Sequence, residues 1–443
     1  MHLSNRFILT LSVITYVSAA GILCNSSSSC PEDLPCCSQY GECGVGSYCL
    51  GGCHPVFSYS IDSCMPMPVC KNLTTSFSDI DDLINQEDYL GDASDGDWIY
   101  NGYIDKFDDS LLLAMPNQSS GTVLSSTHYV WYGKISAHLK TSHLQGVITA
   151  FILFSNAQDE IDYEFIGSEL DLVESNYYYQ AVLNYTNVKN TTVSNTYENF
   201  HTYEIDWTPE ELTWSIDGNA FRTLKKADTY NESTESYHYP QTPSRVQISL
   251  WPGGDSKNKI GTVAWAGGAI DWNSDDIKDN GYYYMLLKNI SVECYVPPSS
   301  IHIEGDQSYV FNNSKSFDQD DIIITDEDTV LGSKKATGLD PDEGKESSSA
   351  SSSSSSSTDQ STKTKSSSGG KSTGSSENTT KKDGGDKGGS SSTSAATGFV
   401  QFGESTSASG GKDASSSNGG IMSLPENSII SIVVSFLMFF TAL

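Results

Sequence analysis

The sequence predicts an all-β fold of the sandwich or jelly-roll type between about residues 76 and 298. Residues 131–140 alternate apolar and polar side chains, as a strand with one buried face does, and residues 203–207 and 212–216 repeat the pattern. Asp217-Gly218 then marks a hairpin, because both residues tolerate positive φ. Many short strands with turn signals between them, and few helix signals, are typical of two packed antiparallel sheets.

The most informative stretch of this region spans residues 158–167 and reads Q-D-E-I-D-Y-E-F-I-G. In a strand, Glu160, Asp162 and Glu164 would share one face while Ile161 and Tyr163 pack behind it. Neighbouring carboxylates raise one another's pKa, which is useful where one acid must keep its proton. The alternative interpretation is a solvated edge strand whose charges discourage aggregation.

Glycoside chemistry needs such a pair of acids. A retaining glycosidase places a nucleophilic carboxylate and an acid/base carboxyl about 5 to 5.5 Å apart. On a flat strand the Cα atoms of Glu160 and Glu164 would lie about 13 Å apart. We therefore expect inward-leaning side chains on a curved sheet.

The spelling E-x-D-x-E at residues 160–164 resembles the active-site strand of glycoside hydrolase family 16, and D-E-I-D-Y-E-F-I-G resembles its fungal Crh branch, which transfers chitin onto wall glucan. The resemblance implies a concanavalin-like β-sandwich with Glu160 as nucleophile, Glu164 as acid/base and Asp162 as the assisting residue between them. It also implies sugar contacts at Trp251 and Trp265, which have glycines close by.

A second acidic motif, E-x-D-x-x-E at Glu169, Asp171 and Glu174, is the bulged variant of the same family motif and ranks second. The apolar run 147–154 supplies a buried strand directly before the first motif. This placement favours the first motif as the catalytic one.

Charge and composition exclude several classes of function. The formal net charge is −31, with 56 acidic and 25 basic residues, which argues against binding to nucleic-acid phosphates. The His residues are scattered and no G-x-S-x-G motif occurs, so we expect no metal site, no Ser-His-Asp site and no cofactor. Single His residues such as His138 and His201 are interpreted as structural or surface residues.

The N-terminal region indicates secretion. Residues 1–20 read as a cleaved signal peptide. Nine of the ten cysteines follow within residues 24–70, which in a secreted chain indicates a disulfide framework. Sequons that fit export occur at Asn25, Asn72, Asn117, Asn184, Asn190, Asn231, Asn289, Asn312 and Asn378.

Residues 21–70 form a small module that its disulfides must stabilise. The run C-C-S-Q-Y-G-E-C-G at residues 36–44 resembles a hevein-type chitin-binding domain. That resemblance implies sugar contacts from Ser38, Tyr40 and Tyr48, with Glu42 where the family has a further ring. A purely structural cysteine knot is the alternative.

The cysteine spacing leaves the connectivity open. One arrangement pairs the first four cysteines forward with the next four, and leaves the last two to clasp the ends of the β-domain. The first four are Cys24, Cys30, Cys36 and Cys37, the next four are Cys43, Cys49, Cys53 and Cys64, and the last two are Cys70 and Cys294.

The C-terminal third reads as unfolded. Residues 301–346 are acidic with little apolar periodicity, which predicts a mostly disordered spacer. Residues 347–420 are rich in Ser and Thr and predict an extended stalk. Residues 421–443 resemble the removed tail of a glycosylphosphatidylinositol (GPI) anchor signal, with lipid attachment near Asn418. A retained C-terminal helix is the alternative.

Together with these features, the resemblance to the Crh branch implies an extracellular cell-wall enzyme that cleaves chitin β-1,4 bonds with retention and transfers the chain onto β-1,3- or β-1,6-glucan, with minor chitinase activity. Its partners would be chitin, β-glucan and the GPI lipid, with no obligate protein partner. Two alternatives stay open, a family 16 endo-β-glucanase and a non-catalytic chitin-binding adhesin.

Overall fold

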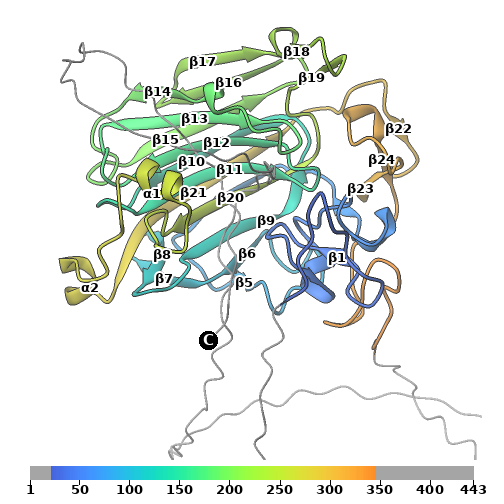
Figure 1. Cartoon of the computed structure of the whole chain (residues 1–443), viewed down its shortest axis with the longest axis horizontal. Helices are drawn as coiled ribbons and strands as arrows, with labels where there is room; N and C mark the ends of the chain where they lie inside the picture. Colours follow the sequence, from blue (N-terminus) through green and yellow to red (C-terminus); the bar gives the residue numbers. More distant parts are fainter. Residues whose placement is uncertain (1–20, 346–443) are drawn as a thin grey trace, which may run out of the picture. The chain divides into compact units, whose positions relative to one another are not determined.

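The computed structural model describes residues 21–345, and this part of the chain is almost entirely β (Figure 1). The predicted signal peptide, stalk and anchor signal, with Asn378 and Asn418, lie outside the described residues. All helices within residues 21–345 are too short or too polar to cross a bilayer. They are α1 (Ile260–Trp265), α2 (Asp275–Asp279), η1 (Gly46–Cys49), η2 (Ile61–Ser63), η3 (Tyr185–Asn187), η4 (Lys226–Thr229) and η5 (Gln319–Asp321).

Two eight-stranded sheets pack face to face, as the sequence predicts (Figure 1). The front sheet has the order β14 (Lys189–Thr192), β13 (Leu172–Tyr178), β12 (Glu160–Ile166), β11 (Ile148–Ser155), β20 (Ser244–Trp251), β9 (Thr122–Val130), β6 (Trp98–Asn101), β5 (Ile84–Asn85). The back sheet has the order β17 (Asn219–Lys225), β16 (Glu211–Ile216), β15 (His201–Trp207), β10 (Gly133–Lys140), β21 (Tyr282–Cys294), β8 (Ser110–Pro116), β7 (Tyr103–Phe107), and β4 (Leu73–Ser76) also pairs with β21.

The alternating patterns form the strands that they predict. β10 alternates buried and half-buried residues along its whole length, and β15 does the same. The β16–β17 hairpin turns at Asp217 and Gly218, whose φ angles are 49° and 77°. A two-residue turn with both φ angles positive matches the twist of the paired strands, so the hairpin prediction is confirmed.

The core lies between the two sheets and is rich in aromatic residues. Side chains from the inner face of each sheet interdigitate there, as the period-two alternation requires. The largest fully buried members include Trp98, Trp131, Trp207, Trp214, Tyr163, Tyr203, Phe151 and Phe165. Burial of this aromatic set fixes the sheets against each other and so fixes which side chains point away from the core.

The disulfide-rich module, residues 21–70, carries β1 (Cys36–Cys37), β2 (Cys43–Gly44) and β3 (Met67–Pro68). The forward pairing of its cysteines is wrong. The bonds are Cys24–Cys37, Cys30–Cys43, Cys36–Cys49 and Cys53–Cys64. Cys36 and Cys37 are neighbours in β1 and point to opposite sides, so one bonds downstream and the other upstream.

The last two cysteines, Cys70 and Cys294, are bonded to each other. This bond joins residues 224 positions apart in the sequence. It lies next to the pairing of β4 with β21, where Leu73 faces Val292. The two ends of the sandwich are therefore clasped, as the sequence-based arrangement has it.

The disordered spacer predicted for residues 301–346 is wrong for the described part, residues 301–345, which we call the C-terminal segment. It forms β22 (His302–Ile303), β23 (Ser308–Phe311) and β24 (Ile322–Thr325), which join β3 in a four-stranded sheet. Tyr309, Ile322 and Ile324 are buried and belong to the main core cluster. Its strands are short, and β23 pairs with β3, about 240 residues upstream, a pairing that no local pattern reveals.

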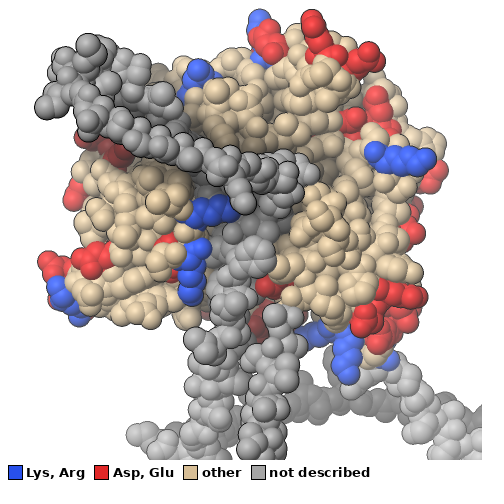
Figure 2. Space-filling model, in the orientation of Figure 1, with Lys and Arg blue, Asp and Glu red and all other residues tan. Residues whose placement is uncertain are grey.

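A two-stranded ribbon completes the described secondary structure. β18 (Tyr230–Asn231) pairs with β19 (Ser236–Tyr237) beside the end of β17 (Figure 1). On the face of the molecule drawn in Figure 2, exposed acidic side chains gather around the edge. The acids of β12 are different, because all three are buried.

Candidate active site

β12 places Glu160, Asp162 and Glu164 on the side of the front sheet that faces away from the core. The intervening residues Ile161 and Tyr163 are buried between the sheets. The Tyr163 hydroxyl donates hydrogen bonds to back-sheet carbonyl oxygens, that of Glu204 at 3.0 Å and that of Ser215 at 2.8 Å. These bonds hold Tyr163 between the sheets, so the alternate residues of β12 point away from the core. The prediction that the three acids share a face is confirmed. We call this outer side of the front sheet the acidic face.

The register gives each acid a defined neighbour on β13. Glu160 is paired with Tyr178, Asp162 with Asn176 and Glu164 with Glu174. On the other side β11 presents Ala150, Ile152 and Phe154, which form a small apolar cluster. The acids are therefore bordered by polar residues on one strand and by an apolar strip on the other.

The environment of Glu164 favours its protonated form. Burial raises its pKa well above the usual range, and the charges of Asp162, Glu174 and Glu160 raise it further. Burial and the charge of Glu160 also raise the pKa of Asp162, against the opposing effect of Arg222. A carboxyl group that keeps its proton near neutral pH can act as a general acid.

Arg222 supplies positive charge behind the sheet. Its guanidinium donates to the Ser175 carbonyl oxygen at 2.6 Å and to the Asn187 carbonyl oxygen at 2.6 Å. It also lies over the Trp214 ring, 4.2 Å from the centroid. Burial lowers its pKa to about 10, so it stays charged at neutral pH.

Trp251 and Trp265 lie together at the Glu164 end of the acidic face. Their rings stack with centroids 6.0 Å apart and planes 27° apart. Trp251 ends β20 and pairs with Ile148 of β11, and Trp265 belongs to α1. The indole N–H of Trp265 donates to Glu174 Oε2 at 3.0 Å, so this ring is tied to the acidic row.

The second acidic motif is divided by the fold. Glu169 and Asp171 are exposed in the turn between β12 and β13, whereas Glu174 is buried on β13 and faces Glu164. These three residues therefore do not form a second row of acids on one face of a strand. Its last residue belongs to the acidic face, a role that the sequence pattern missed because cross-strand register is not a local property.

Asp159 holds the turn before Glu160 and is also missed by the pattern. Its Oδ2 accepts hydrogen bonds from the Gln241 amide at 2.8 Å, the Thr242 amide at 3.0 Å and the Thr242 hydroxyl at 2.7 Å. Its Oδ1 accepts from the Gln180 amide at 3.0 Å. The preceding residue, Gln158, has a φ of 65°. Asp159 therefore fixes a strained turn at the entrance to β12.

Ser38, Tyr40 and Tyr48, the three predicted sugar contacts of the disulfide-rich module, differ in their surroundings. Ser38 is buried, and its hydroxyl accepts from the backbone amides of Tyr40 and Glu42, each at 3.3 Å. Burial raises the pKa of the Tyr40 hydroxyl, with a nearby Gln39 and Arg245 acting against it. The Tyr48 ring packs against Gly44, where a Cβ atom would approach it to 2.5 Å.

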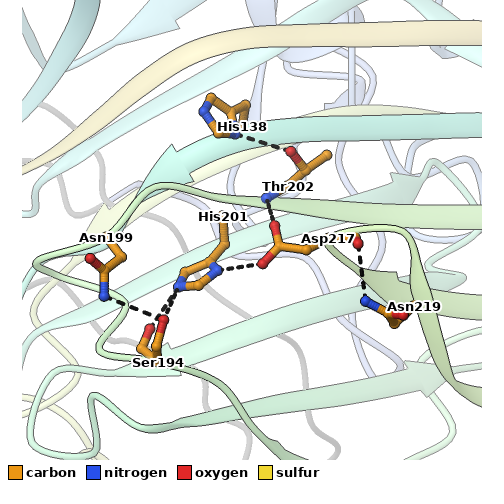
Figure 3. Close-up of polar contacts among 7 residues, drawn as sticks. All are labelled: His138, Ser194, Asn199, His201, Thr202, Asp217 and Asn219. Carbon is orange, nitrogen blue, oxygen red and sulfur yellow. Dashed lines mark hydrogen bonds and ion pairs between the residues drawn. The ribbon is translucent and has the colours of Figure 1, made fainter.

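His201 forms the centre of a polar cluster on the back sheet (Figure 3). Its Nδ1 lies 2.7 Å from Asp217 Oδ2, and its Nε2 lies 3.2 Å from the Ser194 hydroxyl and 2.6 Å from the Ser194 carbonyl oxygen. A carbonyl oxygen only accepts, so Nε2 carries a proton and cannot take one from Ser194. The cluster is structural, and so is His138, which bonds the Thr202 hydroxyl at 3.0 Å.

Comparison with known proteins places the chain in a family. A sequence model described as "Glycosyl hydrolases family 16" matches residues 92–267, inside the β-sandwich. Congo red hypersensitive protein 2 of Saccharomyces cerevisiae is 50% identical over 350 residues, which cover 78% of this chain and 75% of that protein. The chain belongs to glycoside hydrolase family 16, among its Crh-like proteins.

A second relative agrees with this placement. Crh-like protein 2 of Aspergillus fumigatus is 51% identical over 352 residues, 78% of this chain and 79% of that protein. A solved structure named "Apo Crh5 transglycosylase" is 26% identical, has a TM-score of 0.49 and matches 61% of this chain and 99% of that one. The chain described here is thus a Crh-like member of a glycosyl hydrolase family.

Proposed function

We propose that this protein is an extracellular cell-wall transglycosylase that cleaves β-1,4 bonds of chitin with retention and transfers the released chain onto β-glucan. The observation that carries the proposal is the common face of Glu160, Asp162 and Glu164, set on a strand whose other side is anchored in the core. Membership of the family described as "Glycosyl hydrolases family 16" supports the cleavage of glycosidic bonds.

In the first step, a carboxylate oxygen of Glu160 attacks the anomeric carbon of the donor sugar. A bond forms between them while the glycosidic C–O bond breaks, and the proton of Glu164 moves to the leaving oxygen. The product is a covalent glycosyl-enzyme. The raised pKa of Glu164 suits this step, because the group must hold its proton until the bond breaks.

In the second step, Glu164 is a carboxylate and takes a proton from a hydroxyl group of the incoming glucan. The glucan oxygen bonds to the anomeric carbon, and the bond to Glu160 breaks. Water in place of glucan gives the minor chitinase activity. Retention is essential to this chemistry, since the covalent intermediate conserves the bond energy that makes transfer feasible.

Asp162 and the two tryptophans complete the proposed site. Asp162 lies between the two glutamates on the same face. Its raised pKa allows it to keep a proton next to the Glu160 carboxylate and so to adjust the reactivity of this nucleophile. Trp251 and Trp265 lie beside Glu164, where their stacked rings are suited to the flat apolar side of a sugar.

Secretion and anchoring belong to the same proposal. We propose a signal peptide over residues 1–20, a GPI lipid near Asn418 and N-linked sugars at the sequons. Exposure of Asn72, Asn117, Asn184, Asn190 and Asn312 at the surface supports glycan attachment. In this proposal the protein acts at the plasma membrane and in the wall, and its module binds chitin.

The test is product analysis with chitin oligosaccharides as donors and fluorescently labelled β-1,3- or β-1,6-glucan oligosaccharides as acceptors. The parent protein should form a labelled hybrid product, and Glu160→Gln and Glu164→Gln should each lose it, by about 10²- to 10⁴-fold for the acid/base. The control Glu169→Gln changes an exposed acid of the second motif and should act as the parent does.

Other outcomes identify the alternatives. Cleavage of glucan without a hybrid product would indicate an endo-β-glucanase, which shares every proposed catalytic residue. Chitin binding without any bond cleavage, unchanged in both glutamine variants, would indicate an adhesin. Retention of the hybrid product in Glu160→Gln would overturn the assignment of the nucleophile.

A further inference from the structure

The disulfide-rich module reaches the acidic face of the sandwich. Gln39 of the module accepts a hydrogen bond at its Oε1 from Gln247 Nε2 of β20, at 3.1 Å. Gln247 points to the same side as the acids, because its neighbours Val246 and Ile248 belong to the core between the sheets. Both glutamines are buried, with 6% and 1% of their surface exposed.

The sheet register shows how near this contact is to the acids. Ile152 of β11 is paired with Asp162 on one side and with Gln247 on the other. Gln247 is therefore two strands from Asp162, which is about 10 Å across the sheet. A polysaccharide that crosses the strands at Asp162 would pass over Gln247 and reach the module.

Polar atoms beside this contact are buried and have no hydrogen-bond partner among the described residues. They are Gln247 Oε1 and the Ser249 hydroxyl of β20, and on the other side of Asp162 both amide atoms of Asn176. An unpaired buried polar group costs free energy, and native proteins keep few of them. Such atoms on both sides of an acidic row are suited to a ligand rich in hydroxyl and amide groups.

The module is held rigidly where it meets the face. The Gly52 amide donates to Asn156 Oδ1 at 3.0 Å and to the Tyr129 hydroxyl at 3.2 Å. At Gly51 a Cβ atom would lie 2.0 Å from the Arg245 guanidinium, so the backbone is in direct contact with β20. Bonds of this kind fix the side chains of the module relative to the sheet.

The C-terminal segment closes over the other side of the module. The Gly46 amide donates to the Ala336 carbonyl oxygen at 2.9 Å, and the Gly338 amide donates to the Ser63 carbonyl oxygen at 3.0 Å. Leu331 and Ala336 share an apolar cluster with Leu50 of the module. The module is therefore packed between the front sheet and this segment, as Figure 1 shows at the β9 end.

We propose that the disulfide-rich module forms part of the substrate-binding surface of the enzyme, with Gln39 and Tyr40 of the module and Gln247 and Ser249 of β20 as one sugar subsite. The proposal rests on the proposed function above. The subsite takes the hydroxyl or N-acetyl groups of a β-linked pyranose, from the chitin donor or from the glucan acceptor. In this proposal the module is a fixed wall of the site and not a separate tether.

The experiment measures binding by calorimetry in the full-length Glu160→Gln protein, with chitin oligosaccharides in one arm and β-glucan oligosaccharides in the other. Gln39→Ala and Gln247→Ala should each weaken binding in one arm by about five-fold, the effect of one lost hydrogen bond, and leave the other arm unchanged. The affected arm tells whether donor or acceptor occupies the subsite. Because the two glutamines bond each other, the double variant should lose less than the product of the two effects.

Ser249→Ala separates binding from folding. The hydroxyl that it removes has no partner within the described residues, so the thermal midpoint should stay the same or rise, while affinity falls about three- to five-fold. Tyr59→Ala is the control, since this ring is 49% exposed on the module. It should bind both ligands as the parent does.

The proposal is overturned if the glutamine and serine variants keep parental affinity for both ligands, or if Tyr59→Ala weakens chitin binding as much as Gln39→Ala does. The second result would mean that the module binds chitin through its outer surface. Failure of the proposed function would be a different result, namely that the parent enzyme forms no hybrid product. The binding measurement does not depend on product formation, so the two failures can be told apart.

Discussion

Glu164 and Glu174 face each other directly across β12 and β13. Both are buried, and the indole of Trp265 donates a hydrogen bond to Glu174. Glu164 Oε2 has no hydrogen-bond partner within residues 21–345. Burial raises the pKa of Glu174, and the indole hydrogen bond acts against this rise. Glu164 has no such donor, so of the two carboxyl groups Glu174 is the one favoured as the anion and Glu164 the one that keeps its proton.

Glu174→Gln should therefore shift the alkaline limb of the pH–rate profile to lower pH. Burial makes the largest contribution to the raised pKa of Glu164, and the Glu174 charge adds to it. Without this charge, Glu164 loses its proton at lower pH, and the general acid is lost there. At neutral pH the rate should fall by less than about 10²-fold, the lower bound for complete loss of a general acid.

The measurement is kcat/KM against pH for hybrid product formation. Glutamine keeps an oxygen acceptor for the Trp265 indole, so the tryptophan pair should stay in place. Glu169→Gln serves as the matched control, because it removes a negative charge from the exposed turn of the same hairpin. An unshifted alkaline limb in Glu174→Gln would show that its charge does not act on Glu164.

The sequence predicts what depends on local alternation. The buried Tyr163 behind the acids and the turn at Asp217 and Gly218 are confirmed because strand periodicity and turn conformation are properties of neighbouring residues. The sequence pattern places Glu174 only in the second-ranked motif, because its position opposite Glu164 depends on the pairing of two strands. The close approach of the two proposed catalytic carboxyl groups on a curved sheet stays a prediction.

Pairing between residues far apart in the sequence explains why the prediction of a disordered spacer over residues 301–346 is wrong. β23 pairs with β3 of the module, so two of its four residues, Ser308 and Tyr309, have partners that lie far upstream in the sequence. The acids of residues 318–328 lie outside the strands, where charge is compatible with folding. Asp318, Asp320 and Asp321 come before β24, and Asp326, Glu327 and Asp328 follow it. The contact of Gln39 with Gln247 likewise joins residues 208 positions apart, and no local pattern predicts it.

Asp217→Asn should destabilise the fold by about 1 kcal/mol near neutral pH, a discounted value because the carboxylate is half exposed. Partial burial opposes the effect, but hydrogen bonds from His201 and the Thr202 amide lower the pKa of Asp217. A lowered carboxyl pKa in the folded state gives stability that is present above the unfolded pKa of about 3.9 and is lost as pH falls below it.

The check is urea unfolding of parent and variant between pH 3 and pH 7, values that bracket the unfolded pKa (about 3.9). The difference in unfolding free energy should be largest at the upper end and should decrease toward the lower end. Asparagine tolerates the positive φ of this turn position, so the hairpin stays intact. A double-mutant cycle with His201→Gln isolates the pair, and a difference that does not change with pH would contradict the assignment.

Asp159→Asn should lower activity through the position of Glu160. Four hydrogen bonds reach the Asp159 carboxylate, and an amide nitrogen in place of one oxygen would face at least one of these donors. We expect a loss of about 2 to 4 kcal/mol in unfolding free energy, because buried donors lose their acceptor.

The readout is kcat against KM for hybrid product formation, together with the thermal midpoint. A displaced nucleophile lowers kcat with little effect on KM, whereas a disturbed sugar subsite raises KM. Asp171→Asn is the control, since it changes an exposed aspartate in the next turn of the same sheet. Parental kcat in a folded Asp159→Asn protein would rule out the positioning role.

The C-terminal segment is linked to the same turn through two glutamines. Gln180 and Gln241 donate their backbone amides to Asp159 and their side-chain amides to Asp318 Oδ1, at 3.2 Å and 2.9 Å. The Tyr179 hydroxyl also donates to Asp318 Oδ1, at 2.7 Å. Asp159 and Asp318 are thereby joined through shared partners, although one begins the acidic strand and the other lies near the end of the described chain.

Asp318→Ala should therefore lower both stability and activity. Three buried or half-buried donors would lose their acceptor, at a cost of about 2 to 3 kcal/mol in unfolding free energy. Asp320→Ala is the matched control, because this aspartate is exposed two positions away and its loss should cost less than about 0.5 kcal/mol. Urea unfolding and the rate of hybrid product formation measure the two effects.

Since Gln180 and Gln241 reach both aspartates, Asp318→Ala combined with Asp159→Asn should cost less unfolding free energy than the sum of the single changes. Strictly additive losses would mean that the C-terminal segment and the turn before Glu160 act independently.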